Sequence, residues 1–270
     1  MPDGPRDELG ILYRIALAVH RAVRDAAGSP HRADVVGMGA TGSPTEEIDR
    51  LAENEVVRCL DAEGVDWDLV SEEVGVVRRG GRRSLVVDPI DGTSNALRQL
   101  PFSAVSLALG SGTLDGIELG LVRDLDRGTT YWASRGGGAF RDGRPVRVRP
   151  WRAGAEVVFL NLGARAGPRP GQVGAKARRV RALGSASLEM MLVAQGAADA
   201  YLFDNADAGR NLRPTDLAAA YRIVREAGGA IAAADGTPID GLPLGVDRRT
   251  SVLAVGDVAL ARAIGEGRFA

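Results

Sequence analysis

The sequence predicts a layered fold of two lobes, an α+β lobe over residues 1–150 and an α/β lobe over residues 151–270. From Asp68 to about Val148 the chain alternates short apolar runs with glycine-rich or charged turns, which is the pattern of an antiparallel sheet. After Trp151, apolar strands alternate with helical patterns, which is typical of a mixed sheet covered by helices. The 270 residues are 45% hydrophobic, so the chain can bury a sizeable core.

Two amphipathic helices are predicted before the first sheet. Residues 7–27 carry apolar side chains three and four positions apart, which gives a helix one face to pack on a core. A second helix is expected to begin with Ser43 as its N-cap, Pro44 in its first position and Glu46 as the acid of a capping box. This helix is expected to run to about Leu60.

Asp49 has an unusual place on the second helix. At about 100° per residue it falls between Val56 and Leu60 on the helical wheel, at the flank of the apolar stripe. A solvated position remains open. If the carboxylate points inward it needs a partner or a metal, because burying an unpaired charge is costly.

The loop VVGMGATG between these helices contains Gly37, Gly39 and Gly42 in the G-x-G-x-x-G order of a dinucleotide-binding turn. That function also needs an acid at the end of a second strand about 20 residues further on. The acids near that distance, Asp61 and Glu63, lie at the end of the predicted helix instead. The pattern therefore predicts a loop and argues against a dinucleotide site.

The first lobe is predicted to be a meander of short strands. Turn signals at RRGGRR, GSGTLD and RDLDRG separate the apolar runs, and RRGGRR is interpreted as an exposed hairpin tip. The predicted strands are residues 68–73, 83–88, 104–110, 116–122, 129–134 and 144–148.

The second lobe is predicted to alternate strands and helices. Ser185 is the expected N-cap of one helix, and Gly228 ends a long helix that starts at Pro214. The other predicted elements are strands at 156–161, 200–204 and 251–256 and a helix near 172–180.

Composition argues against several classes of function. A net charge of −1 and a pI near 6.2 give no positive field that would recruit nucleic acid or a membrane, so neither partner is expected. Cys59 is the only cysteine, and His20 and His31 are the only histidines, which excludes an internal disulfide and disfavours a zinc site or a Ser-His-Asp triad. No stretch resembles a signal peptide or a membrane span, and a cytoplasmic location is expected.

Acidic residues gather where two predicted strands end. Asp88 closes the run SLVVD and Asp91 follows in a tight turn, while Glu72 and Glu73 end the preceding strand. Each pair of carboxylates about 4 Å apart repels by roughly 1 kcal/mol in water and about 4 kcal/mol at the effective dielectric of a protein site. A positive group is therefore expected among them, and oxygen ligands without His or Cys suit magnesium, manganese or calcium.

Gly92, Thr93 and Ser94 follow these acids and are small residues at a predicted helix start. Backbone N–H groups exposed at such a start can hold a phosphate. A metal beside a phosphate cradle indicates phosphoryl chemistry, in which one metal activates water and another stabilises the departing oxygen.

Three segments carry a family resemblance: Ser71-Glu72-Glu73, the run DPIDGTSN from Asp88 to Asn95, and TDLAA from Thr215 to Ala219, which is followed by EAGG. In order and spacing they resemble the three signatures of the inositol monophosphatase superfamily, which includes fructose-1,6-bisphosphatases, over residues 37–256. The loop GMGATGSPTEEID resembles in particular the archaeal-type enzymes that act on both inositol monophosphates and fructose-1,6-bisphosphate.

The resemblance implies a layered αβαβα sandwich of the sugar-phosphatase type, two or three Mg²⁺ ions that Mn²⁺ can replace, and a homodimer. It also implies ligands for the metals. Glu72, Asp88 and the Ile90 carbonyl would hold the first ion, Asp88, Asp91 and Asp216 the second, and Glu72 would share a third.

The resemblance further implies catalytic and substrate-binding roles. Thr93, paired with Asp49, would position and deprotonate the attacking water, and the backbone amides of Gly92 and Thr93 would bind the phosphate. Ser185 lies in a turn that resembles the substrate-side turn of the family.

The chain departs from the family pattern at two positions. Thr215 stands where a tryptophan is usual, and Gly209 stands where animal enzymes carry the acid that grips inositol hydroxyls. Arg210 and Arg213 near Asp216 are candidates for binding a second phosphate, although ordinary surface arginines remain an equal interpretation. Glu73 stays ambiguous, because neighbours on a strand face opposite sides and only one of Glu72 and Glu73 should reach the metals.

These observations predict a Mg²⁺-dependent phosphomonoesterase that hydrolyses inositol 1-phosphate, fructose 1,6-bisphosphate or a related small sugar or cyclitol phosphate by metal-activated water. A nucleotide bisphosphate or NADP as substrate remains open, as does lithium sensitivity. A haloacid-dehalogenase-type phosphatase is disfavoured because two residues, not one, separate Asp88 from Asp91. A phosphosugar-binding protein without turnover is the non-enzymatic alternative.

Overall fold

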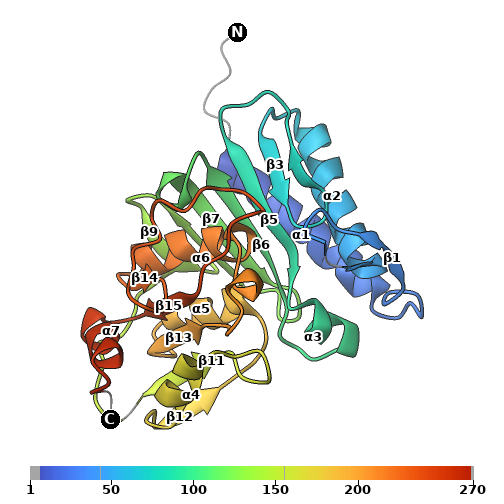
Figure 1. The fold of residues 1–270 in the computed structure, drawn as a ribbon. Coiled ribbons are helices and arrows are strands. Elements are labelled where there is room, and N and C mark those ends of the chain that lie inside the picture. Colours follow the sequence, from blue (N-terminus) through green and yellow to red (C-terminus); the bar gives the residue numbers. More distant parts are fainter. Residues whose placement is uncertain (1–6, 43, 155, 269–270) are drawn as a thin grey trace.

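A computed structural model describes residues 7–42, 44–154 and 156–268 and shows two large sheets and their helices in five layers (Figure 1). Helices α1 (Glu8–Ala26) and α2 (Glu47–Glu63) cover the outer face of the first sheet. Helices α5 (Ala186–Ala194) and α6 (Pro214–Glu226) lie between the two sheets. The layered αβαβα fold expected from the resemblance is therefore confirmed.

The first sheet has eight strands in the order β10-β9-β8-β7-β6-β5-β3-β4. Every neighbouring pair is antiparallel except β3 and β5, which run parallel because β4 returns along the far side of β3 before the chain reaches β5. The antiparallel meander is thus wrong for this pair, and RRGGRR is a connection across β3 rather than a hairpin tip. The strands are β3 (Asp68–Ser71), β4 (Gly75–Val77), β5 (Ser84–Asp91), β6 (Ala104–Gly110), β7 (Ile117–Asp124), β8 (Thr130–Ser134), β9 (Gly138–Arg141) and β10 (Arg144–Val146).

The segment before α2 differs from its prediction. Part of the predicted glycine loop forms β1 (Val35–Met38), which pairs with β2 (Pro44–Glu46) in a two-stranded hairpin. Pro44 and Glu46 are therefore strand residues, and the helix begins at Glu47 with Glu46 in the N-cap position. The predicted N-cap Ser43 lies outside the described residues.

The second sheet is mixed, as predicted, with the order β12-β11-β13-β15-β14. The helix expected near 172–180 lies earlier, because Arg179–Arg181 pair with β11 as the edge strand β12. The remaining elements are β11 (Val157–Leu160), α4 (Pro168–Gly174), β13 (Ala200–Phe203), β14 (Ala230–Ala232), β15 (Val252–Val255) and α7 (Val258–Gly265).

The hydrophobic core between the two sheets crosses the predicted lobe boundary near residue 150. It contains residues of the first sheet, of α5 and α6, and of the second sheet. Alternate residues on the strands face the other layers, so that Leu85 and Val87 pack under α1 and α2 while Val86 faces α6. Among the described residues, no helix is both long and apolar enough to cross a membrane.

Candidate active site

Two buried aspartates, Asp88 and Asp91, lie at the end of β5. Asp88 pairs with Ser106 and Asp91 with Ala104, so the register shifts between them and the strand bends. Asp88 Oδ1 accepts a hydrogen bond from the Ile90 amide at 3.1 Å. Because Asp88 follows Val86 by two residues, its side chain projects toward the α6 side of the sheet.

Asp91 is held by the start of α5. Its Oδ2 accepts hydrogen bonds from Ser185 Oγ (2.7 Å) and the Ser187 amide (2.6 Å), and its Oδ1 accepts one from the Ala186 amide (3.2 Å). A helix N-terminus favours a carboxylate, and these donors offset part of the cost of its burial. Ser185 therefore contacts Asp91 in this structure, and its predicted contact with substrate stays a prediction.

The start of α6 brings Asp216 and Glu72 to the same place. Asp216 Oδ2 accepts a hydrogen bond from the Arg213 amide (2.7 Å). Glu72 Oε1 accepts a hydrogen bond from the Thr215 hydroxyl (3.0 Å), and Glu72 Oε2 forms an ion pair with the Arg213 guanidinium (2.9 Å). Thr215, which stands where the family usually has tryptophan, thus anchors a predicted metal ligand.

These acids lie close enough together to raise one another's pKa. Burial raises the pKa of Asp88 well above its ordinary value, and the charges of Asp91, Asp216, Glu72 and Asp49 raise this pKa further. Burial and the charge of Glu72 likewise raise the pKa of Asp216. The structure therefore brings together all the predicted carboxylate ligands and Asp49.

Asp49 and Thr93 make the contact that the resemblance implied. Thr93 Oγ1 lies 3.1 Å from Asp49 Oδ1 and 2.9 Å from the Ile90 carbonyl oxygen. Asp49 is only 6% exposed, which rules out the solvated position. Burial, a side-chain hydrogen bond with Glu46 and the charge of Glu73 raise its pKa to about 8.

Glu73 faces away from the start of α6, where Glu72 is held. It accepts a hydrogen bond from the Thr45 hydroxyl of the β1–β2 hairpin, and its backbone carbonyl accepts one from the Ala40 amide. The contacts of the two side chains in the turn after β3 resolve the ambiguity, because Glu72 meets Thr215 and Arg213 while Glu73 meets Thr45. Glu73 instead ties the hairpin to the sheet.

The donor set fits a hard divalent cation by its chemistry. It consists of carboxylate oxygens and the Ile90 carbonyl, without His or Cys. Across residues 7–42, 44–154 and 156–268, however, no three Asp, Glu, His or Cys side chains are arranged to hold an ion. The hydrogen bonds described above account for this, because Asp91, Asp216 and Glu72 each point at a protein donor.

The predicted phosphate cradle is closely packed. Gly92 has a φ of 90°, and a Cβ there would lie 3.1 Å from the carbonyl oxygens of Gly184 and Phe102, so the position favours glycine. Thr93 begins helix α3 (Thr93–Arg98). Ser94 is exposed, and its hydroxyl contacts the Arg98 guanidinium at 2.5 Å.

The two predicted arginines lie in different surroundings. Arg210 is exposed and lies 3.5 Å from the Asp207 carboxylate, whereas Arg213 is buried against Glu72. Arg249, which the sequence analysis missed, also lies here, because Arg213, Glu72 and Asp216 all influence its pKa. It follows no recognisable motif, so only the fold reveals it.

Three further residues of the site carried no readable signal in the sequence. Ser187 donates to Asp91, Glu53 is a buried acid on α2 next to Ser71, and Glu189 is a buried acid that accepts from the Leu183 amide. Burial raises the pKa of Glu189 to about 8, although the Leu183 amide donates to it at 2.7 Å. In the sequence each of them is an ordinary helix residue, and only the folded structure shows the group that it contacts.

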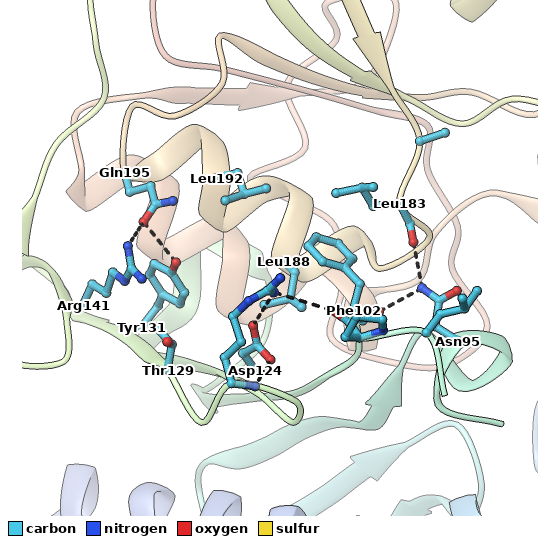
Figure 2. A pocket seen from close by; sticks show the side chains of 14 residues that line it. Asn95, Phe102, Asp124, Thr129, Tyr131, Arg141, Leu183, Leu188, Leu192 and Gln195 are labelled. Atoms are coloured by element: carbon cyan, nitrogen blue, oxygen red, sulfur yellow. Dashed lines mark hydrogen bonds and ion pairs between the residues drawn. The ribbon is translucent and has the colours of Figure 1, made fainter. Parts of the chain in front are cut away.

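A cavity of about 570 Å³ lies on the other side of the Leu183 turn (Figure 2). Asn95 forms its wall toward the site and donates to the carbonyls of Phe102 (2.8 Å) and Leu183 (2.7 Å). At the opposite end, Gln195 accepts hydrogen bonds from Tyr131 and Arg141. None of the predicted metal ligands lines this cavity.

The layered fold, with carboxylates from three distant segments converging beside a glycine turn, defines a phosphoric monoester hydrolase of the sugar-phosphatase kind. A model of the Inositol monophosphatase family matches residues 6–264. The chain belongs to this family.

Known relatives agree with this assignment. The chain is 37% identical, over 93% of its length and 92% of the other, to a fructose-1,6-bisphosphatase/inositol-1-monophosphatase of Methanothermobacter thermautotrophicus. It is 29% identical to a bifunctional NADP phosphatase/NAD kinase of Methanococcus maripaludis, of which it covers 49%. A solved Pyrococcus horikoshii structure described as similar to inositol-1 monophosphatase superposes with a TM-score of 0.83 at 25% identity, covering 98% of this chain and 99% of that one.

Proposed function

We propose that this protein is a Mg²⁺-dependent phosphatase of small sugar or cyclitol phosphates, with inositol 1-phosphate and fructose 1,6-bisphosphate as first candidates. The mutual approach of Asp88, Asp91, Asp216 and Glu72 carries the proposal, since their repulsion calls for cations. When bound, Mg²⁺ would acidify a water molecule and neutralise charge on the phosphate. The two archaeal activities named for the Methanothermobacter relative support this choice of substrates.

The chain's own residues would handle the proton. Thr93 has one hydroxyl proton, so when it donates to Asp49 its lone pairs are free to accept a proton from water. In its ionised form Asp49 would take the proton that Thr93 passes on, and its raised pKa of about 8 makes it a stronger base than an ordinary carboxylate. The backbone amides of Gly92 and Thr93, at the start of α3, would bind a phosphate oxygen.

The arginines favour a substrate with a second anionic group. Arg249 and the exposed Arg210 lie near the acids, whereas Arg213 is already paired with Glu72, and Gly209 has no side chain with which to bind a cyclitol hydroxyl. A bisphosphate such as fructose 1,6-bisphosphate fits this charge pattern best. Removal of the phosphate from NADP is the second candidate, which the Methanococcus relative supports.

A phosphate-release screen tests the proposal. The purified protein is incubated with inositol 1-phosphate, fructose 1,6-bisphosphate and NADP, each with Mg²⁺ or with EDTA. We expect Mg²⁺-dependent release from at least one compound and none with EDTA. Release that persists in EDTA would contradict the metal-dependent mechanism, and binding without release would favour the non-enzymatic alternative. The homodimer stays a prediction that sedimentation can check.

A further inference from the structure

Glu53 is a buried acid that none of the roles above uses. It lies on α2 one helical turn after Asp49, and only 3% of its surface is exposed. Its Oε2 accepts a hydrogen bond from Ser71 Oγ at 2.5 Å. Its Oε1 is buried and has no hydrogen-bond partner within the described part of the chain.

Stability does not account for this side chain. A buried carboxylate with one unsatisfied oxygen costs free energy, and an apolar residue of similar shape avoids that cost. Its neighbours on this face, Ala52 and Val56, belong to the apolar core between α2 and the first sheet. Burial and the nearby charge of Glu73 raise the pKa of Glu53 to about 7, which is a measure of how unfavourable the site is for the ion.

The residue that Glu53 binds, Ser71, directly precedes the predicted metal ligand Glu72. Ser71 is the last residue of β3 and is fully buried. Side chains alternate along a strand, so Ser71 points to α2, as Leu69 does. Glu72 is the next residue, the first of the turn after β3, and its side chain meets Thr215 of α6. A shift of Ser71 therefore moves Glu72.

Helix α2 reaches both strand ends that carry acids. Asp49 contacts Thr93 just after β5, and Glu53 contacts Ser71 at the end of β3. The two acids are four residues apart and so lie on one face of the helix. Because β3 and β5 are parallel neighbours, α2 fixes one strand end relative to the other.

We propose that Glu53 is a positioning residue that holds the end of β3 through Ser71 and thereby aims Glu72 at the divalent cation. The inference rests on the proposed function, since it presumes a cation among these acids. Glu53 itself touches neither metal nor substrate. Loss of such a supporting residue typically lowers metal affinity about 10–100-fold.

Two variants break the hydrogen bond in opposite ways. Glu53→Leu removes the buried charge, so we expect an equal or higher melting temperature, whereas Ser71→Ala leaves both carboxylate oxygens unpaired and should lower it. Glu53→Gln keeps an acceptor for Ser71. Glu55→Leu, which removes the α2 surface pair with Arg58, is the matched control.

The readout is Mn²⁺ binding by calorimetry without substrate, together with hydrogen exchange of residues 68–75 in EDTA. We expect Glu53→Leu and Ser71→Ala each to weaken Mn²⁺ binding about tenfold or more and to speed exchange in this segment, while Glu53→Gln and the control stay within about threefold of wild type. A merely structural role predicts that affinity follows the melting temperature, so that Glu53→Leu binds normally.

Wild-type affinity in both Glu53→Leu and Ser71→Ala would overturn the inference. If the wild-type protein binds Mn²⁺ and releases phosphate in that case, the proposed function stands and only the role of Glu53 fails. If the wild-type protein binds no Mn²⁺ at all, the proposed function and the inference both fail.

Discussion

The acids of the site accept hydrogen bonds from donors in different parts of the chain. Asp91 accepts from the start of α5, Asp216 from the Arg213 amide, and Glu72 from Thr215 and Arg213. A carboxylate with such donors can stay buried without a cation. Asp88 accepts a hydrogen bond from the Ile90 amide, and burial together with the charges of the other acids raises its pKa well above the ordinary value.

Asp91→Asn should abolish turnover and leave the fold intact. Asparagine keeps one oxygen for the Ser187 amide and removes a charge that repels Asp88, but its NH2 group faces the Ala186 amide, so the metal-free melting temperature should change little. Phosphate release should fall at least about 100-fold, the scale of losing one electrostatic stabiliser. Activity within tenfold of wild type, measured at saturating Mg²⁺, would contradict the role of Asp91.

Thr93→Val should lower kcat about 10²–10⁴-fold, the range for loss of a general acid–base group, because valine cannot relay a proton to Asp49. Thr93→Ser keeps the hydroxyl and is the matched control, which should retain most of the rate. Equal rates in the two variants would exclude the relay. The measurement is steady-state phosphate release over a pH series.

Helix α6, which carries Asp216, lies directly on the first sheet. At Gly120 of β7 a Cβ would come within 2.7 Å of the Ala219 carbonyl oxygen and 3.0 Å of its Cα. The alanines of α6 and this glycine therefore allow a close approach. The same helix carries Asp216 in its first turn.

Gly120→Ala should destabilise the protein by about 1–3 kcal/mol, because backbone atoms of α6 cannot move aside cheaply. Gly171→Ala in α4, where a Cβ would meet nothing within 4 Å, is the control and should be neutral or slightly stabilising. Urea unfolding of both variants measures the difference. Equal stability of the two would show that α6 packs less closely than described.

Helix α1 contains a pH-sensitive group in His20. Burial and the charges of Arg123 and Arg24 lower its pKa below the ordinary 6.5, and its Nδ1 is buried without a described partner. The folded state therefore resists protonation. The contribution of His20 to stability is complete above about pH 6.5 and is lost as the pH falls below that value.

His20→Gln should remove that loss. We expect the difference in melting temperature between wild type and His20→Gln to shift in favour of the variant between about pH 6.5 and 5. The exposed His31, which lies 2.8 Å from Asp34, provides the control variant His31→Gln. Parallel pH curves for wild type and His20→Gln would show that His20 titrates normally.

On the scale of the whole molecule, segments far apart in the chain meet in one buried acidic site. Its carboxylates come from α2, from the ends of β3 and β5, and from α6. The pKa values of Asp49, Asp88, Asp91 and Asp216 are raised in the folded protein, to about 8 for Asp49. Without metal, their contribution to stability is present below about pH 4 and is lost as the pH rises through these folded pKa values.

Mg²⁺ should therefore stabilise the protein more at pH 8 than at pH 5. At about 100 times its dissociation constant a ligand adds roughly 2.7 kcal/mol, which corresponds to about 5 °C or more for a chain of this size. Calorimetric scans with Mg²⁺ and with EDTA at both pH values measure the effect. Asp88→Asn should reduce it, and an equal shift at both pH values would argue against binding among these acids.

Sequence reasoning predicted most elements and singled out the acids that lie close together, and it failed where strand pairing decides the structure. The run from Asp88 to Ser94 carries its chemistry in consecutive residues, so the pattern is readable without the fold. Val35–Met38 and Arg179–Arg181 form strands only because partner strands lie beside them. Arg249, Glu53 and Ser187 are ordinary residues until the chain folds back on them.

By itself the sequence determined the layered fold, the family and the identity of the clustered acids, because periodicity, turn chemistry and local motifs are properties of neighbouring residues. The tertiary structure decided that Glu72 rather than Glu73 meets α6, that Asp49 points inward to Thr93, and that Glu53 lies behind Ser71. These choices depend on contacts between residues up to 143 positions apart. Strand register and helix packing fix such contacts, and no local pattern encodes them.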